Sequence, residues 1–321
     1  MQTRVLGGLV LLVALATTAC DEGAAPTAND APDPNMASAR TEISKALVAI
    51  NQRLARQKRH VRVPFADYRT AEGTGRVGQR IFAFDRGNKR FGIEFVAGDP
   101  RRGGRTNITY LVDQSDGATH TVNPLANALT EPAIDRAMNT WEAVRCSKVS
   151  IDKVADPGID PDITDSLLGV GELGTPLADI THAGWVGPEF FDALVPPDGS
   201  TFILAVTIPF FFTEDDGITP TDIDGDGALD YAFAEIFYND AFPWGINAFF
   251  PLADVQGTSL HESGHGLGQA HFGKIFQTVA NGKIHFAPFA VMNAVDPGFP
   301  TQVLQGTDIG GHCGIWASWP H

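Results

Sequence analysis

The stretch that decides the fold is residues 261–271, which read HESGHGLGQAH. On a helix, His261 and His265 lie one turn apart, so their imidazole rings project from the same face. Two glycines follow, and glycine tolerates the positive φ of a sharp turn that ends a helix. Such a turn brings His271 back as a third nitrogen ligand. Three neutral imidazoles suit Zn²⁺ and leave its fourth position open for water, which is typical of a catalytic zinc site.

Glu262 directly follows the first of these histidines. It is placed to take a proton from metal-activated water and to pass that proton to the leaving amine of a peptide bond. A bare His-x-x-x-His pair arises often by chance, whereas the full pattern fixes six positions in eleven residues. The segment therefore predicts a zinc site made by His261, His265 and His271, with Glu262 as general base.

The same segment resembles the HExxHGxGxxH signature of the metzincin zinc peptidases. That superfamily has a methionine turn after the third histidine, and residues 290–294 (AVMNA) resemble it, with Met292 standing 21 residues after His271. The resemblance implies that Met292 forms an apolar floor under the ligands without binding the metal. Ala294 stands where astacin- and serralysin-like members carry a tyrosine. The implied site is therefore closer to that of the matrixins.

The resemblance covers about residues 106–321 and implies an α+β fold. This would be a metzincin-like zincin domain with a twisted mixed β-sheet, an active-site helix, a methionine turn and a C-terminal helix. It also implies that residues 235–239 form the edge strand that holds an extended substrate. Apolar periodicity predicts helices at 38–58 and 131–145, the second capped by Thr130. Strands are expected at residues 80–84, 91–96, 106–112, 149–154, 178–181, 201–212 and 234–238.

The N-terminus has the pattern of an export signal. Residues 1–20 carry Arg4 and then an apolar run of 11 residues, too short to span a bilayer, before small residues lead into Cys20. This resembles a bacterial lipoprotein signal, whose cysteine would carry a lipid that anchors the protein in a membrane; ordinary signal cleavage is the alternative. Residues 21–37 are typical of a flexible tether. We therefore expect an exported protein, either a cell-envelope lipoprotein or a secreted one.

Disulfides persist outside the cytoplasm. Cys146 and Cys313, the two cysteines that follow the signal, are therefore expected to pair, with two free thiols as the alternative.

Charge divides the 321-residue chain unevenly, around a net charge of −15. Residues 1–105 carry 17 Lys/Arg against 10 Asp/Glu, and residues 106–321 carry 6 against 28. The acidic part argues against a nucleic-acid partner, because phosphates would be repelled. We interpret residues 38–105 as a basic N-terminal extension or pro-segment, inhibitory or chaperoning, beside a catalytic domain at 106–321. A permanent extension packed on that domain is the alternative.

A second cation site is predicted at residues 222–230, DIDGDGALD. Carboxylates stand at positions 1, 3, 5 and 9 of this tight loop, on Asp222, Asp224, Asp226 and Asp230. Hard oxygen ligands at that spacing suit Ca²⁺. Position 12 is Phe233 rather than the glutamate of a full EF-hand loop. The loop therefore predicts an EF-hand-like structural calcium site, with a solvated acidic turn as the alternative.

Together these patterns predict an extracytoplasmic zinc endopeptidase that acts on a protein or peptide substrate. A calcium-dependent surface binding or adhesion lipoprotein, built on a retained metallopeptidase fold, is the alternative. Glu262 favours the enzyme, because a binding module needs no general base beside its metal. The other histidines lack ligand spacing and are expected in structural or surface roles.

Overall fold

The computed structural model describes residues 43–85, 92–113, 125–278, 280–281 and 283–320. The described residues all belong to one compact unit, which spans Glu42–His321. The predicted signal at 1–20, its Cys20 and the tether at 21–37 lie outside the described residues. Among the helices that are described, none is long and apolar enough to cross a membrane.

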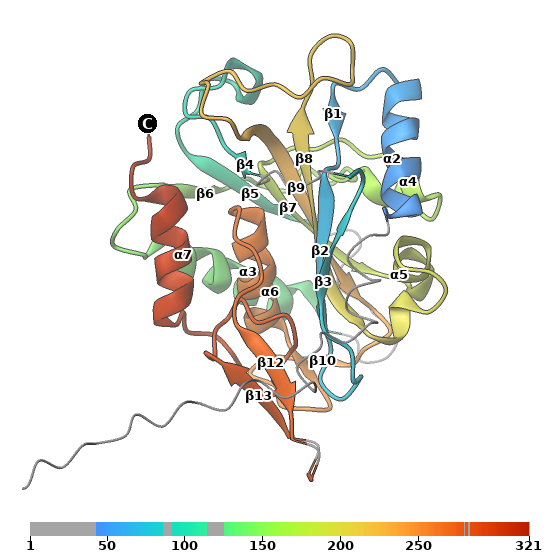
Figure 1. Cartoon of the computed structure of the whole chain (residues 1–321), viewed down its shortest axis with the longest axis vertical. Coiled ribbons are helices and arrows are strands. Elements are labelled where there is room, and N and C mark those ends of the chain that lie inside the picture. Colours follow the sequence, from blue (N-terminus) through green and yellow to red (C-terminus); the bar gives the residue numbers. More distant parts are fainter. Residues whose placement is uncertain (1–42, 86–91, 114–124, 279, 282, 321) are drawn as a thin grey trace, which may run out of the picture. The chain divides into compact units, whose positions relative to one another are not determined.

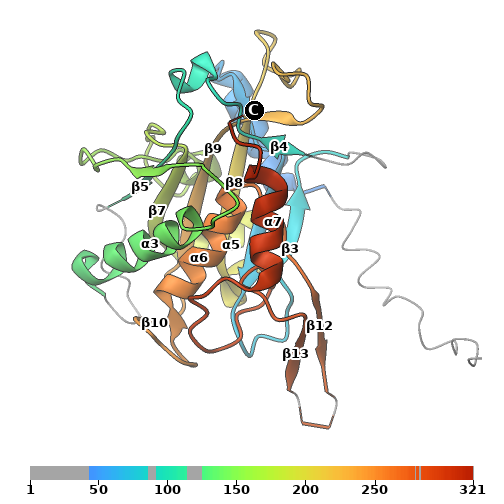
Figure 2. The ribbon, with the colours of Figure 1, turned by 90° about the vertical axis from the view of Figure 1, so that its left-hand side faces the viewer.

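A twisted mixed sheet forms the centre of this unit (Figures 1 and 2). Its strands are β1 (Val61–Arg62), β2 (Phe65–Thr70), β3 (Gln79–Phe82), β4 (Ile93–Glu94), β5 (Ile108–Val112), β6 (Ile151–Lys153), β7 (Ile180–Val186), β8 (Ile203–Phe212) and β9 (Leu229–Asn239). They run in the order β3-β2-β8-β9-β7-β5-β6, with β1 beside β8 and β4 beside β9. Strands β6, β5, β7 and β9 are parallel to one another. Beyond β9, each of β8, β2 and β3 pairs antiparallel with the strand before it in this order.

Helices cover both faces of this sheet (Figure 1). On one face lie α3 (Asn127–Glu142), α6 (Val255–Gly266) and α7 (Gly306–Trp316), and on the other lie α2 (Lys45–Arg56), α4 (Thr164–Leu168) and α5 (Pro188–Leu194). Each face has its own buried apolar cluster. The fold is therefore α+β, as predicted. Two small sheets complete it: β10 (Trp244–Gly245) with β11 (Ala253–Asp254), and the projecting hairpin of β12 (Lys274–Gln277) and β13 (Ile284–Ala287) (Figure 2).

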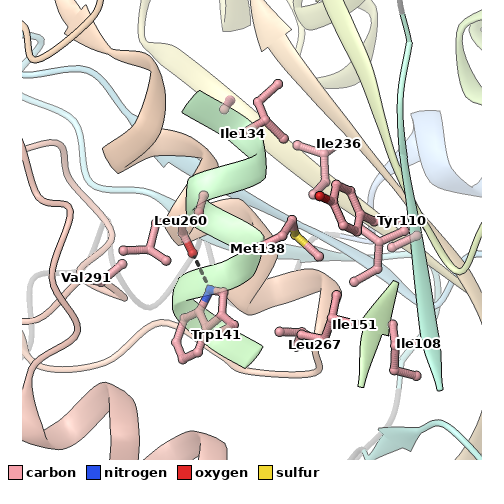
Figure 3. Close-up of a cluster of buried hydrophobic side chains, with 14 of the residues drawn as sticks. Ile108, Tyr110, Ile134, Met138, Trp141, Ile151, Ile236, Leu260, Leu267 and Val291 are labelled. Carbon is pink, nitrogen blue, oxygen red and sulfur yellow. Dashed lines mark hydrogen bonds between the residues drawn. The ribbon is translucent and has the colours of Figure 1, made fainter. Parts of the chain in front are cut away.

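The core between α3, α6 and the sheet is shown in Figure 3. Met138 and Trp141 of α3 point into it, and the indole Nε1 of Trp141 donates a hydrogen bond to the Leu260 carbonyl of α6 at 2.8 Å. Cys146, just after α3, forms a disulfide with Cys313 of α7. The three helices of this face are thereby joined to one another.

Each predicted strand has a counterpart in the structure, but two predictions about elements are wrong. α3 begins at Asn127 with Ala126 as its N-cap, so Thr130 is a buried residue inside the helix and not its cap. The first turn was missed because it carries little apolar periodicity, with Leu129 half exposed. Residues 235–239 are not an edge strand, because β9 pairs with β7 on one side and with β8 on the other. Its continuous burial is typical of a central strand.

Candidate metal centre

Helix α6 presents two of the three predicted zinc ligands. Asp254 caps its start, where Oδ2 accepts a hydrogen bond from the Gly257 amide at 2.8 Å. The helix ends at Gly266, and Gly268 adopts φ +89°, a left-handed conformation that glycine adopts without strain. The chain then turns back, so that the ring of His271 approaches those of the two helical histidines.

The three imidazoles converge on one point. One ring nitrogen from each of His261, His265 and His271 lies within 4.8 Å of the other two, and Nε2 of His261 is 3.1 Å from Nε2 of His265. Nδ1 of His261 lies 2.7 Å from the Val291 carbonyl oxygen, and Nδ1 of His265 lies 2.8 Å from the Gln269 carbonyl oxygen. A nitrogen that faces a carbonyl must carry the proton, so each Nε2 turns a lone pair toward the other. A cation satisfies that pair, and three neutral imidazoles fit Zn²⁺.

Burial keeps these ligands in the form that binds metal. Desolvation holds the pKa of His261 and of His271 well below the ordinary value, and it also lowers the pKa of His265. The imidazoles are therefore neutral at pH 7, as a ligand must be. Nε2 of His271 is buried without a hydrogen-bond partner among the described residues, which leaves its lone pair for a metal.

Glu262 is fully buried, and its two carboxyl oxygens differ. Oε2 accepts a hydrogen bond from Oγ1 of Thr207 on β8 at 2.7 Å, whereas Oε1 has no hydrogen-bond partner within the described part of the chain. Burial raises the pKa of Glu262 to about 8, against a lowering by the Thr207 hydroxyl. The geometry therefore leaves one carboxyl oxygen free to exchange a proton with a neighbouring group.

Met292 packs against α6 at Gly264. A β-carbon added to Gly264 would lie 2.4 Å from Sδ of Met292, so the absence of a side chain there lets the sulfur approach the helix. Asp308 of α7 fixes the turn, because its carboxylate accepts hydrogen bonds from the Val291 amide at 2.9 Å and the Met292 amide at 3.1 Å. Sequence reasoning did not select Asp308 as a site residue.

Charged residues of β2 also lie against the metal centre, and sequence reasoning missed them. Oδ2 of Asp67 is 3.5 Å from Nδ1 of His265, and Arg80 of β3 holds the same carboxylate at 2.6 Å. Arg69 is buried 3.4 Å from Asp296, with no hydrogen-bond partner for its guanidinium among the described residues. The available signal was a strand that places two charges, Asp67 and Arg69, on one face of an otherwise apolar segment.

The predicted calcium ligands separate into two environments. Carboxylate oxygens of Asp222, Asp224 and Asp226 lie within 4.8 Å of one another, and all three side chains are exposed. Asp230 is buried and pairs with Arg101 at 2.7 Å. Desolvation and the neighbouring Asp226 raise the pKa of Asp224. The loop thus gathers three hard oxygen ligands, and Asp230 faces a guanidinium instead.

Other buried histidines have structural surroundings. Nδ1 of His182 lies 2.7 Å from the Tyr238 hydroxyl, and His312 stacks on Trp141 with ring centroids 5.5 Å apart.

Comparison with known proteins found no matching family model and no matching curated protein for this chain. An assignment of function therefore rests on the metal centre itself.

Proposed function

We propose that this chain is an extracytoplasmic zinc endopeptidase of the matrixin-like metzincin type. The observation that carries the proposal is the pair of Nε2 lone pairs on His261 and His265, 3.1 Å apart, with His271 as third donor and Glu262 beside them. A zinc site with three imidazole ligands leaves a position open for chemistry. Further support comes from the order of the elements, with α6, the Met292 turn and α7 following the mixed sheet.

His261, His265 and His271 would hold Zn²⁺, which would supply the Lewis acidity that activates water and polarises the scissile carbonyl. Glu262 takes the proton of the attacking water on its unengaged Oε1 and transfers it to the amide nitrogen as the C–N bond breaks. Thr207 holds Oε2 and so orients the carboxylate. The carbonyls of Val291 and Gln269 keep two imidazole rings in the ligating tautomer.

A calcium-dependent binding or adhesion lipoprotein is the second candidate, favoured by the exposed acidic loop at Asp222, Asp224 and Asp226. Within the peptidase proposal, that loop holds a structural Ca²⁺ that orders the turn leading into β9. Calcium would then change the stability of the protein and leave the chemistry of peptide hydrolysis to the histidine centre.

Replacing Glu262 by Gln separates the two candidates. For the peptidase, wild type cleaves a mixed peptide library, either intact or after limited trypsin digestion, whereas Glu262→Gln treated in the same way retains about one zinc per chain and loses at least 100-fold in rate. The exposed Glu189→Gln is the matched control and keeps the wild-type rate. Zinc-loaded wild type and variant that are equally inert both before and after trypsin digestion, with calcium-dependent surface binding, would favour the second candidate.

Export is proposed from residues 1–20, with a lipid on Cys20 that anchors the protein. The disulfide between Cys146 and Cys313 is consistent with an oxidising compartment. Lipid labelling of wild type and Cys20→Ala in the native host tests this proposal. Label on wild type alone supports a lipoprotein, and label on neither supports a secreted protein.

A further inference from the structure

We propose that the β2–β3 hairpin is a built-in inhibitor, in which β2 occupies the strand position that an extended peptide substrate would take along β8. The inference rests on the proposed peptidase function, and it gives the β2–β3 part of the basic N-terminal segment an inhibitory role. It also replaces β9 with β8 as the substrate-binding strand.

Strand β8 is the one that offers an edge beside the general base. Its Thr207 contacts Glu262 and stands directly opposite Asp67 of β2. Apart from β2, its partner on that side is the two-residue β1, which pairs at the far end with Phe211 and Phe212. If β2 left, residues 203–207 of β8 would present unpaired backbone groups next to the metal centre. An extended peptide adds to such an edge by main-chain hydrogen bonds.

The other side of β2 pairs with β3 along residues 65–68 and, at the end of the strand, with the segment that follows Met292. The Thr70 amide donates to the Ala294 carbonyl at 3.2 Å, and the Asp296 amide donates to the Thr70 carbonyl at 2.8 Å. β2 is therefore bound through its backbone on both sides, by β8 on one side and by β3 and residues 294–296 on the other. A peptide substrate that binds in extended form across the metal centre would lie between β8 and residues 294–296 in the same way.

The side chains of β2 close the space above the ligands. Asp67 lies against His265, and the buried Arg69 lies beside Asp296. His261 and Glu262 are both 0% exposed under this cover. Neither a peptide nor bulk water reaches the general base while the hairpin is in place.

Gly78 and Arg80 help to hold the hairpin in place. A β-carbon on Gly78 would lie 2.3 Å from the Tyr68 carbonyl oxygen and 2.4 Å from that of Ala294, so a side chain would force these backbones apart. Arg80 pairs with Asp67 through both Nε and Nη2. Gly78→Ala and Arg80→Ala each loosen the hairpin without touching a zinc ligand or Glu262.

The inhibitory part ends before β4. Arg102 makes a buried ion pair with Asp179 at 2.9 Å, and Phe95 stacks on Tyr231 with ring centroids 4.1 Å apart. Residues 92–105 thus belong to the body of the catalytic domain, although they share the basic character of the preceding segment.

Binding of a peptide hydroxamate to the full-length, zinc-loaded chain tests the inhibitor without using turnover. We expect Gly78→Ala and Arg80→Ala to bind it at least tenfold more tightly than wild type and to release zinc faster to a chromophoric chelator. Arg76→Ala, an exposed arginine of the same hairpin, is the control and behaves as wild type. Equal affinity in wild type and in both folded hairpin variants would overturn the inference.

Limited trypsin digestion of the wild-type full chain provides a second test that needs no variant. The inference predicts that peptide cleavage and hydroxamate affinity rise at least tenfold as N-terminal sequencing shows the hairpin to be removed. An intact chain that already cleaves peptides at its final rate would overturn the inference and leave the peptidase proposal standing. Zinc-loaded chains that cleave nothing before or after removal would contradict the peptidase proposal itself.

Discussion

The chemistry at the residue scale depends on how the surroundings treat each oxygen of Glu262. The motif at residues 261–271 supplies Glu262. Thr207 of β8 supplies the hydroxyl that donates to Oε2, and Oε1 has no hydrogen-bond partner among the described residues. The histidine spacing predicted the clustering of the three imidazoles, because two of them lie on one helix and the third follows a glycine turn. Thr207 could not be predicted, because it is 55 residues away and belongs to another element.

Thr207→Val removes that hydroxyl at nearly constant volume. We expect kcat to fall about 10- to 100-fold at unchanged zinc content, the equivalent of roughly 1.5–3 kcal/mol for a hydrogen bond to a charged group. The acid limb of the pH–rate profile should also move to higher pH, because the hydroxyl lowers the pKa of Glu262. Thr213→Val is the control, since that buried hydroxyl has no hydrogen-bond partner among the described residues. An unchanged kcat would show that Thr207 does not position the base.

His312 links stability to acid conditions. Burial lowers its pKa to about 4 from an ordinary value of 6.5. Between pH 6.5 and 4 this histidine is therefore protonated in the unfolded chain and neutral in the folded chain. Stability is therefore lost as pH falls through that window, at about 1.4 kcal/mol per pH unit. We expect His312→Phe, which can still stack on Trp141, to lose less stability than wild type between pH 6.5 and 4 in denaturant titrations. The exposed His60→Phe is the control, and parallel wild-type and His312→Phe curves would contradict this assignment.

At the scale of elements, the sequence was most informative where a cap, a periodicity and a stop coincide. α6 has Asp254 as its N-cap, and it ends at the glycines that the sequence predicted as its stop. Strand β2 was not predicted as a separate element, because its buried face carries Asp67 and Arg69 in place of apolar residues. β9 was taken for an edge because pairing partners distant in the chain leave no local mark on an apolar strand.

Gly264 shows how closely the elements around the metal are packed. Gly264→Ala would place a methyl group 2.4 Å from Sδ of Met292 and 2.9 Å from the Trp141 ring. Overpacking of this kind typically costs about 1–3 kcal/mol, so the unfolding midpoint should fall and zinc affinity with it. Gly310→Ala is the matched control in α7, where a β-carbon meets nothing within 4 Å and should be neutral or stabilising. Equal midpoints for the two variants would contradict the packing described here.

At the scale of the whole molecule, the disulfide joins cysteines 167 residues apart. A cross-link that closes so long a loop restricts the unfolded chain strongly, and its loss typically costs about 2–5 kcal/mol. We expect the double variant Cys146→Ser with Cys313→Ser to unfold at lower denaturant concentration than wild type, and reduced wild type to resemble it. A double variant with the wild-type midpoint would show that the three helices hold together without the cross-link.

Removal and return of zinc test the central claim most directly. The protein, intact and after trypsin removal of the hairpin, is freed of metal by a chelator and titrated with Zn²⁺ while cleavage of the peptide library is followed. We expect no cleavage without metal, and a rate that rises linearly with added Zn²⁺ and stops rising at about one zinc per chain. Cleavage that persists in metal-free protein, that returns with Ca²⁺ alone, or that never appears in either zinc-loaded form would contradict a zinc peptidase built on His261, His265, His271 and Glu262.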